Sequence, residues 1–387
     1  MPEPARLPLR ESVPATRCWH IYGPLNPSII AGLRIDDKII QSDTVLGRQV
    51  AVGLSRVLRF VRMKSWQVHA FCEPEQMTLD DIPVPVPGPN EVRIRNHAAA
   101  LNFFDILQIQ GKYQIRPPFP FTPGAEVSGI VDAVGPEVKH VFPGDPVTAM
   151  THNGALAEYS LAAGGRTFHT IAGMDFPEAA AMPVVYHTSY FALHRRAGLA
   201  HREWLLVHAG ASGVGMSAIQ IGKAYGAQVI ATAGSRRKLD FCREQGADHA
   251  LPYTNPGWVE RVKEITGGRG VDVVYDPVGG DVFDLSTRCM AAEGRMLVIG
   301  FASGRIPSVP ANRILLKDIS IVGVHWGQYV ADHPEFLAHT HEVLTAMYLG
   351  GQIHPVVGKT FRLEEAAAGL RELAERKILG KAVVLMD

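Results

Sequence analysis

The 387-residue sequence predicts an α/β protein in which a β-rich domain is joined to a doubly wound parallel sheet. Three observations predict this fold class. The length is sufficient for two domains with separate hydrophobic cores. Short strand-like runs broken by Gly and Pro fill the first half, whereas after residue 203 apolar runs alternate with amphipathic segments. A glycine-rich turn joins the first of these apolar runs to the helical segment that follows it.

The composition excludes several classes of function. The formal net charge is zero and like charges form no long run, which argues against a nucleic-acid partner. No apolar run is long enough to span a membrane. The four cysteines, Cys18, Cys72, Cys242 and Cys289, are scattered and form no C-x-x-C pair. A disulfide framework or structural zinc is therefore not expected, and a reducing, cytoplasmic location fits best.

Residues 1–62 lack a sustained hydrophobic period. Arg6, Arg10 and Arg17 would suit a targeting peptide, but glutamates interrupt the basic character and no apolar stretch follows. A strand-like run, MKSWQVHAF, begins at Met63. We therefore expect residues 1–62 to be an extension that folding does not require.

From residue 63 to about 180 the pattern is rich in short strands. The segments NEVRIRNHAAA, EVSGIVDAVG and PGDPVTAM read as strands separated by Gly and Pro turns. A helix is expected to follow, with Asp175 as its N-cap and Pro177 in its first turn. Near the end of the chain, VVGKTFRL and KAVVLM again have the character of strands.

After residue 203 strands and helices alternate. WLLVHAG, QVIATAG, VDVVYDPVG and RMLVIGFAS read as strands, and GMSAIQIGKAYG, RRKLDFCREQG, WVERVKEI and DLSTRCMAAEG as the intervening helices. Apolar strands separated by amphipathic helices indicate a parallel sheet that is covered on both faces.

The glycine-rich turn, Gly210-Ala-Ser-Gly-Val-Gly215, has the context of a dinucleotide-binding loop. We expect Gly210 to allow the tight turn, and Gly213 or Gly215 to let the backbone approach a pyrophosphate. The pattern departs from G-x-G-x-x-G because Ser212 stands where the third residue would be glycine. Phosphates would be bound by the amides of the helix N-terminus, at Ser212, Gly213, Val214 and Gly215.

The next strand lacks the acid that recognises NAD. A carboxylate that accepts from the ribose 2′-hydroxyl is expected about 20 residues past the loop. Ser235 occupies that place, followed by Arg236, Arg237 and Lys238. A neutral hydroxyl followed by cations at a helix start favours a 2′-phosphate, so the cofactor is predicted to be NADPH. The alternative is a solvated basic helix start.

Together these motifs resemble those of a known family. LNFFDILQIQGKY, FPFTPGAEVSGIV, GDPV, VHAGASGVG, ATAGS with Lys238, and DPVGG are similar to motifs of the medium-chain dehydrogenase/reductase superfamily, in its zinc-independent quinone-oxidoreductase (zeta-crystallin-like) branch. The resemblance covers residues 63–387. It implies a GroES-like domain made of residues 63–180 and 331–387, and a Rossmann NADPH-binding domain over residues 181–330.

The resemblance also implies that no metal is bound. Zinc-containing members have ligands where this chain has Asn102, Ala125 and, nearby, Val184. Without a Lewis acid, reduction of a simple ketone would need a strong proton donor. A quinone or an α,β-unsaturated carbonyl spreads the negative charge over its π-system, so positioning and modest hydrogen bonding suffice. We therefore expect a conjugated carbonyl substrate.

The family's acceptor site falls on three residues of this chain. By resemblance, Asn102 and Asp105 orient the nicotinamide amide or the substrate, and Tyr113 lines the acceptor pocket and could donate a proton. A second tyrosine of bacterial relatives falls at Leu107 here. The alternative is that Asn102 caps a turn and Tyr113 contributes to packing. Further cofactor contacts are implied at Thr188, Tyr253, Phe301 and Trp326.

Two other functions stay open. An enoyl-thioester reductase of the acryloyl-CoA type would use the same cofactor, and a non-catalytic NADPH-binding protein would use only the cofactor site. The resemblance further implies a homodimer that pairs along the apolar segment DISIVGV, residues 318–324.

Overall fold

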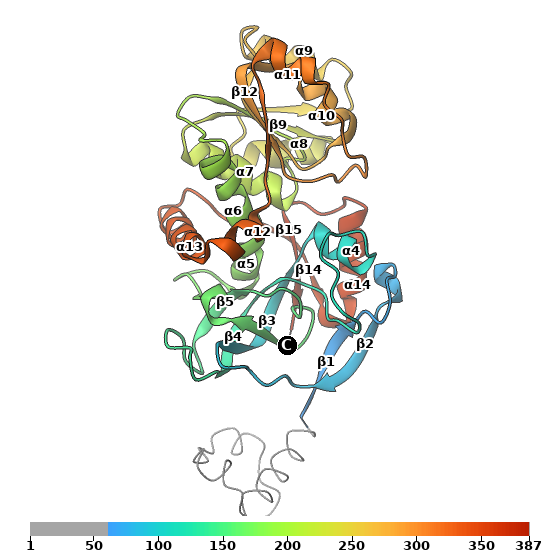
Figure 1. Ribbon diagram of the computed structural model, residues 1–387, viewed down its shortest axis with the longest axis vertical. Coiled ribbons are helices and arrows are strands. Elements are labelled where there is room, and N and C mark those ends of the chain that lie inside the picture. The colour runs from blue at the N-terminus through green and yellow to red at the C-terminus, as the bar shows by residue number, and fades with distance from the viewer. Residues whose placement is uncertain (1–60, 387) are drawn as a thin grey trace, which may run out of the picture. The chain divides into compact units, whose positions relative to one another are not determined.

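The computed structural model describes residues 61–386 of the chain (Figure 1). The expectation about residues 1–62 falls almost wholly outside the described residues, as does Cys18. The first strand begins at Arg62, one residue before the predicted run, and pairs antiparallel with the second strand as a hairpin.

A six-stranded parallel sheet forms the α/β part of the fold. Its strands are β8 (Trp204–Val207), β9 (Gln228–Ala233), β10 (His249–Pro252), β11 (Val271–Asp276), β12 (Met290–Val298) and β13 (Ser320–Gly323). They are ordered β10-β9-β8-β11-β12-β13, and every pairing is parallel. Strand order therefore reverses between β8 and β11, where open α/β sheets bind their ligands.

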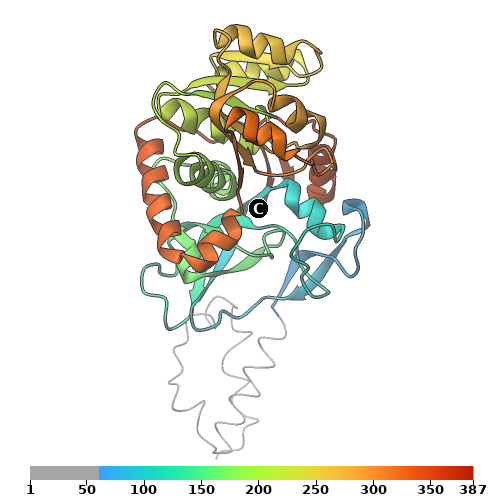
Figure 2. The same ribbon diagram turned by 45° about the horizontal axis from the view of Figure 1, so that its top comes forward.

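Helices cover both faces of this sheet, as the sequence predicts (Figure 2). Leu205 and Val207 point into one core with α6, α7, α8 and α13, whereas Leu206 points into a second core with α9, α10 and α11. The helices are α6 (Pro183–Tyr190), α7 (Gly213–Ala224), α8 (Arg236–Glu244), α9 (Trp258–Ile265), α10 (Gly280–Ser286), α11 (Ala311–Lys317), α12 (Trp326–Asp332) and α13 (Pro334–Leu349). The prediction of a doubly wound sheet is confirmed.

The β-rich part contains the hairpin and a second sheet. Its strands are β1 (Arg62–Gln67), β2 (Thr78–Pro83), β3 (Glu91–Leu101), β4 (Glu126–Val134), β5 (Pro146–Met150), β6 (Tyr159–Ala163), β7 (Thr167–His169), β14 (Val357–Arg362) and β15 (Lys381–Leu385). The sheet is ordered β14-β15-β3-β4-β5-β7, and β6 also pairs with β3. The last strand, β15, thus returns to this larger sheet, where it pairs with β3.

Helices α4 (Phe103–Ile109) and α14 (Ala366–Ala374) pack on the β-rich sheet beside the hairpin (Figure 1). The indole N–H of Trp66 in β1 donates to the Leu363 carbonyl at 2.7 Å. A cluster of alanines from β3 and α5 (Phe176–Ala181), together with Val383, fills the other face. Asp175 caps α5 by accepting from Glu178 N at 2.8 Å, as predicted.

One predicted helix is shorter than expected. DLSTRCMAAEG was assigned to a helix, but α10 ends at Ser286 and β12 begins at Met290, which pairs with Val271. Glu293 has φ 61°, and the register of β11 and β12 shifts nearby. An irregular strand of this kind interrupts the alternation on which strand prediction depends. Among the helices of residues 61–386, none has the length and hydropathy that crossing a bilayer requires.

Candidate active site

The glycine-rich turn leaves the carboxyl end of β8 and opens α7. Ser212 is the N-cap of α7, and its Oγ accepts from Gly215 N at 3.2 Å and donates to Ala209 O at 2.8 Å. The left-handed residue of the turn is Ala209, with φ 49°, rather than Gly210. Gly210 itself does not have a positive φ. Its role is packing, because a Cβ atom there would lie 2.8 Å from Cys242 Sγ.

The other two glycines of the turn are required by close approach. A Cβ atom at Gly215 would lie 2.2 Å from Ala209 O, a backbone atom that cannot move aside. A Cβ atom at Gly213 would lie 2.7 Å from Cδ of Lys381, at the start of β15. Gly215 N already donates to Ser212 Oγ, whereas the amides of Gly213 and Val214 have no intrahelical acceptor and are available to an anion.

The basic segment Ser235-Arg-Arg-Lys238 follows β9 beside this turn. Ser235 is the N-cap of α8, and its Oγ accepts from Lys238 N at 3.4 Å. Arg236 pairs with Asp240 at 3.3 Å, and its side chain is 91% exposed. Lys238 instead reaches the segment between α14 and β15, where its Nζ donates to the Arg376 carbonyl.

Arg376 is a cation that the sequence analysis missed. It lies next to Lys238, and burial, together with the charge of Arg376, lowers the pKa of Lys238. Its guanidinium donates to Ala302 O at 3.1 Å, and its φ is 59°. Because Arg376 is 138 residues from Lys238 in sequence, nothing in the local motif indicates it.

Two aromatic side chains follow the carboxyl ends of β10 and β12. The hydroxyl of Tyr253 is packed over Gly234, where a Cβ atom would lie 2.8 Å from it. Phe301 lies beside Gly279, where a Cβ atom would be 3.0 Å from its Cδ1. Both rings are partly exposed. The turn at Gly279 is held by Asp276, which accepts from Gly279 N at 3.0 Å and whose pKa burial raises to about 6.

A buried charge cluster occupies the end of β3 in the β-rich part. The Nζ of Lys381 donates to Glu126 Oε1 at 2.7 Å, Asn102 Oδ1 at 2.7 Å and Leu101 O at 2.9 Å. The side chains of Lys381 and Glu126 are only 3% and 0% exposed. Glu126 also accepts from Asn102 Nδ2 at 2.8 Å and from Val184 N at 2.7 Å.

This cluster fixes the amide of Asn102 at both ends. Its oxygen accepts from Lys381 and its nitrogen donates to Glu126. Asn102 is the N-cap of α4, as one alternative interpretation predicted, and its backbone N donates to Asp105 Oδ2 at 2.7 Å. The side chain of Asn102 is therefore a fixed part of the site wall, and its two strong hydrogen bonds are made within the protein.

Asp105 is fully buried below Asn102. Burial raises its pKa to about 7, although the Asn102 amide and the charge of Lys381 oppose this rise. Its Oδ1 has no hydrogen-bond partner among residues 61–386. Asp105 can therefore exist as a protonated carboxyl group near neutral pH.

Tyr113 lies beyond α4, where its backbone N donates to Leu107 O at 3.1 Å. Its ring packs against Phe104, with centroids 5.5 Å apart, and it is partly exposed. Burial and the nearby charge of Asp105 raise the pKa of the hydroxyl. That hydroxyl makes no hydrogen bond to the part of the chain that the structure describes.

Thr188 and Trp326 lie on the helices between the two sheets. Thr188 is half-buried in α6, and Trp326 is the first residue of α12. The Trp326 ring lies 6.0 Å from that of His187, and its buried indole N–H has no partner among residues 61–386. Burial lowers the pKa of His187 to about 3, so this histidine is neutral.

The residues at the positions of zinc ligands do not fit a zinc site. Asn102 and Val184 both bond to Glu126 through nitrogen, and Ala125 has no donor atom. In the described part of the chain, no three His, Cys, Asp or Glu side chains gather closely enough to hold a metal ion. The cation that Glu126 meets here is the ammonium group of Lys381.

Lys381 and Glu126 also escaped the sequence analysis, although a signal was present. Glu126 opens the strand EVSGIV and Lys381 opens KAVVLM, and both strands are apolar. A charged side chain in a buried strand requires a partner of opposite charge. Two such residues on strands of the same domain could have suggested the pair.

Comparisons with known proteins match both parts of this architecture. The alcohol dehydrogenase GroES-like domain model matches residues 88–189, and the zinc-binding dehydrogenase model matches residues 213–342. Quinone oxidoreductase-like protein 2 of Mus musculus is 38% identical over 314 residues, which are 80% of this chain and 89% of that protein. The quinone oxidoreductase of Pseudomonas aeruginosa is 36% identical over 324 residues, which are 83% and 99% of the two chains.

A solved structure has the same arrangement. The Escherichia coli quinone oxidoreductase complexed with NADPH superposes with a TM-score of 0.79 at 30% identity. The match covers 84% of this chain and 100% of that one.

Proposed function

Because the chain belongs to the quinone-oxidoreductase branch of the medium-chain dehydrogenase/reductase superfamily, we propose that it is an NADPH-dependent, zinc-free oxidoreductase that reduces a quinone or another conjugated carbonyl. One observation carries the proposal most directly. The N-terminus of α7, at Ser212, and the basic N-terminus of α8, at Ser235, follow the adjacent strands β8 and β9. Gly213, in the first turn of α7, packs against the side chain of Lys381 in the buried charge cluster.

The residues present fit NADPH. The free amides at the N-terminus of α7 suit a pyrophosphate, and Gly215 lets this helix pack close to the turn. Ser235 and Lys238, with Arg376 beside them, offer a hydroxyl and cations to a 2′-phosphate. When bound, the cofactor supplies a hydride, which is the chemistry that the acceptor end of the site must direct.

The Lys381 cluster positions the wall of the site and does not itself contact the reacting atoms. Lys381 already donates to three acceptors and is almost fully buried, so it holds Asn102 in one orientation. A rigid wall positions a planar acceptor and excludes water from it. This role requires no Lewis acid, and it suits a substrate whose π-system accommodates the negative charge.

Tyr113 is the group that we assign to hydrogen bonding with the acceptor. Its hydroxyl is partly exposed and unpaired within residues 61–386, and it lies near Asp105. Because the pKa of Asp105 is raised to about 7, this carboxyl group can lose or regain a proton near neutral pH. Asp105 and Tyr113 would together supply the proton that reduction of the carbonyl consumes.

Oxidation of NADPH with a panel of acceptors tests the proposal. We expect turnover with quinones or α,β-unsaturated ketones, unaffected by exhaustive chelation, and reduced in Tyr113→Phe. Preferred turnover of crotonyl-CoA would assign the enoyl-thioester alternative instead. Tight NADPH binding without turnover of any acceptor would refute catalysis and favour the binding protein.

We also propose that the protein is a homodimer. β13 is the last strand of the parallel sheet, and within residues 61–386 it pairs only with β12. Its side chains are at most half-buried. An unprotected edge of this kind can extend the sheet across a two-fold axis. Sedimentation at micromolar concentration should give twice the chain mass, and a monomer mass would refute the pairing.

A further inference from the structure

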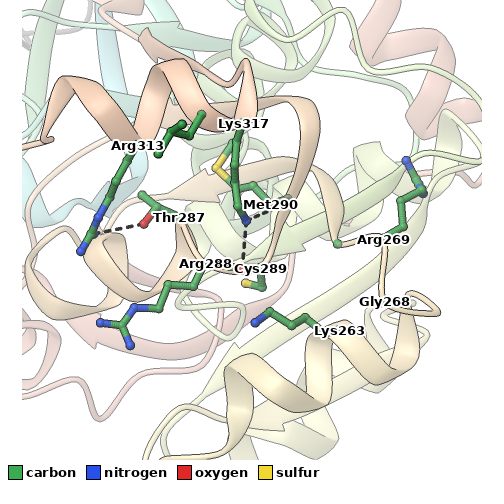
Figure 3. Close-up of a pocket in the computed structure, with 11 residues that line it drawn as sticks. Lys263, Gly268, Arg269, Thr287, Arg288, Cys289, Met290, Arg313 and Lys317 are labelled. Atoms are coloured by element: carbon green, nitrogen blue, oxygen red, sulfur yellow. Dashed lines mark hydrogen bonds between the residues drawn. The ribbon is translucent and has the colours of Figure 1, made fainter.

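A cavity of about 610 Å³ lies at the amino ends of β11 and β12 (Figure 3). The glycine-rich turn and Ser235 follow the carboxyl ends of strands, so this cavity is at the opposite edge of the same sheet. Its volume is in the range of ordinary small-molecule sites. The residues that line it are Lys263, Gly268, Arg269, Gly270, Thr287, Arg288, Cys289, Met290, Arg313, Leu316 and Lys317.

The lining contains five cations and no acid. Only Arg269 has an acidic partner, because Asp272 receives two hydrogen bonds from its guanidinium. The other four, Lys263, Arg288, Arg313 and Lys317, form no ion pair with residues 61–386. The charge of Glu260 on α9 acts on Cys289 in the lining, and Glu260 too forms no ion pair with the described residues.

Two of these four cations are already held in place. Lys317 Nζ donates to Arg288 O at 3.1 Å and to Met290 O at 3.2 Å. Arg313 Nη1 donates to Thr287 Oγ1 at 3.3 Å. Their positions are therefore fixed before any ligand binds, while each still has N–H groups to offer. Preorganised donors lower the entropic cost of binding.

Helix dipoles explain only part of this cluster. Lys263 and Lys317 lie in the last turns of α9 and α11, where a cation is favoured. That effect does not account for Arg288, which lies between α10 and β12. It also does not account for the convergence of cations from three separate segments on one cavity.

Charge repulsion within the cavity favours an anion. Lys263 and Lys317 both point toward Cys289 from opposite sides (Figure 3). Burial, and then the charge of Lys263, lower the pKa of Lys317. An anion placed between the two ammonium groups would offset this repulsion and stabilise the charged form of both lysines.

We propose that this cavity binds a phosphate-bearing anion with two or more negative charges, independently of the nucleotide at the carboxyl edge of the sheet. Two ammonium groups and two guanidinium groups in the lining can donate to the oxygens of a short phosphate chain. Arginine in particular binds phosphate through two parallel hydrogen bonds.

Calorimetric titration of the full chain with tripolyphosphate, at constant ionic strength and with NADPH saturating, tests the proposal. We expect one binding event that is weakened about 10- to 100-fold in Lys263→Gln/Arg288→Gln, since two charge-assisted contacts are lost. Arg261→Gln is the matched control. It removes a cation from the same helix, but Arg261 pairs with Glu264 and does not line the cavity.

The same titration with Lys238→Ala separates this cavity from the nucleotide site. Unchanged affinity in that variant supports the proposal, whereas loss of binding there, or equal binding in Lys263→Gln/Arg288→Gln and wild type, overturns it. Parallel titrations with pyrophosphate and ATP distinguish an inorganic ligand from a nucleotide. Absence of any binding event at millimolar tripolyphosphate would also overturn it.

Discussion

The two ends of the proposed cofactor site use positive charge in opposite ways. At the phosphate end, Arg236 is largely exposed, and the half-buried Lys238 in the same helix turn bonds through Nζ to one backbone carbonyl, that of Arg376. At the acceptor end, Lys381 is buried and its ammonium group is shared among Glu126, Asn102 and a backbone carbonyl. A buried charge must be matched within the protein, whereas an exposed one is free to meet a ligand.

Because of this difference, the acceptor end affects the stability of the fold, whereas the phosphate end affects the affinity for the cofactor. Removing a partner from a buried ion pair leaves an uncompensated charge, so the acceptor end is coupled to folding. Removing an exposed cation changes little except the affinity for an anion. Mutations at the two ends should therefore separate stability from cofactor choice.

The largest effect is expected from Lys381→Met. This change keeps an unbranched side chain, one atom shorter, but leaves the fully buried Glu126 carboxylate without its cation. The free energy of unfolding should fall by about 3–5 kcal/mol, the range for breaking a buried pair. Urea denaturation followed by circular dichroism measures it.

The double variant Lys381→Met/Glu126→Gln is the control for this prediction. Removing both charges should recover much of the lost stability, because no buried charge is then unpaired. A single variant that loses less than about 1 kcal/mol would show that the pair contributes little, and that the two ends do not differ as argued.

The second prediction concerns the pH dependence of stability at the acceptor end. Burial raises the pKa of Asp105 from 3.8 to about 7 in the folded chain. Between these values the unfolded chain loses the proton while the folded chain keeps it, so stability falls as pH rises from about 4 to about 7. The expected slope is on the order of 1 kcal/mol per pH unit.

Asp105→Asn should remove this slope, because an amide does not titrate yet can still accept from Asn102 N. Urea unfolding at pH 5 and pH 8 provides the measurement. The variant should gain stability relative to wild type at the higher pH. An equal pH dependence in both proteins would mean that Asp105 is ionised throughout the range.

The third prediction concerns cofactor choice at the phosphate end. Lys238→Ala should raise the Michaelis constant for NADPH about 10- to 150-fold, which corresponds to about 1.5–3 kcal/mol for one charge-assisted hydrogen bond. NADH should be nearly unaffected. Ser235→Asp should go further, since a carboxylate repels the 2′-phosphate and accepts from a free 2′-hydroxyl.

Ser235→Asp is also a structurally conservative change. Ser235 is the N-cap of α8, and Asp caps helices as well as Ser does. The melting temperature should therefore stay close to that of wild type. Equal changes of the Michaelis constants for NADPH and NADH in these variants would show that Ser235 and Lys238 shape the helix start rather than recognise phosphate.

The same contrast explains what the sequence could and could not predict. The predicted phosphate end consists mainly of the consecutive residues Ser235 to Lys238 and of a turn between one strand and one helix, so a local pattern indicates it, except for Arg376, which is 138 residues from Lys238 in sequence. The acceptor cluster joins residues 102, 126, 184 and 381, from four elements of the fold. Hydrophobic periodicity does not indicate such long-range contacts. The sequence therefore predicts Asn102 and Asp105 as site residues but not the Glu126 and Lys381 charges beside them.

The fold shows the same limit on a larger scale. Most strands of the parallel sheet were predicted because they are apolar and lie between amphipathic helices. Where β12 departs from regular geometry at Glu293, the helix before it was extended too far. There tertiary packing overrode a local preference.

The smallest effect is expected from Arg236→Gln, which completes the comparison within one helix turn. Arg236 carries the same charge as Lys238 and precedes it by two residues, but its side chain points to solvent and pairs with Asp240. An exposed pair of this kind is worth about 0–1 kcal/mol, so the Michaelis constant for NADPH should rise less than about 5-fold. The effect should shrink further at 0.5 M salt, because exposed charges are screened.

If Arg236→Gln weakened the binding of NADPH as strongly as Lys238→Ala, Arg236 would have to leave Asp240 and turn toward the 2′-phosphate when the cofactor binds. Steady-state kinetics with both variants, at low and high salt, shows whether Arg236 binds the 2′-phosphate directly or only lies near it.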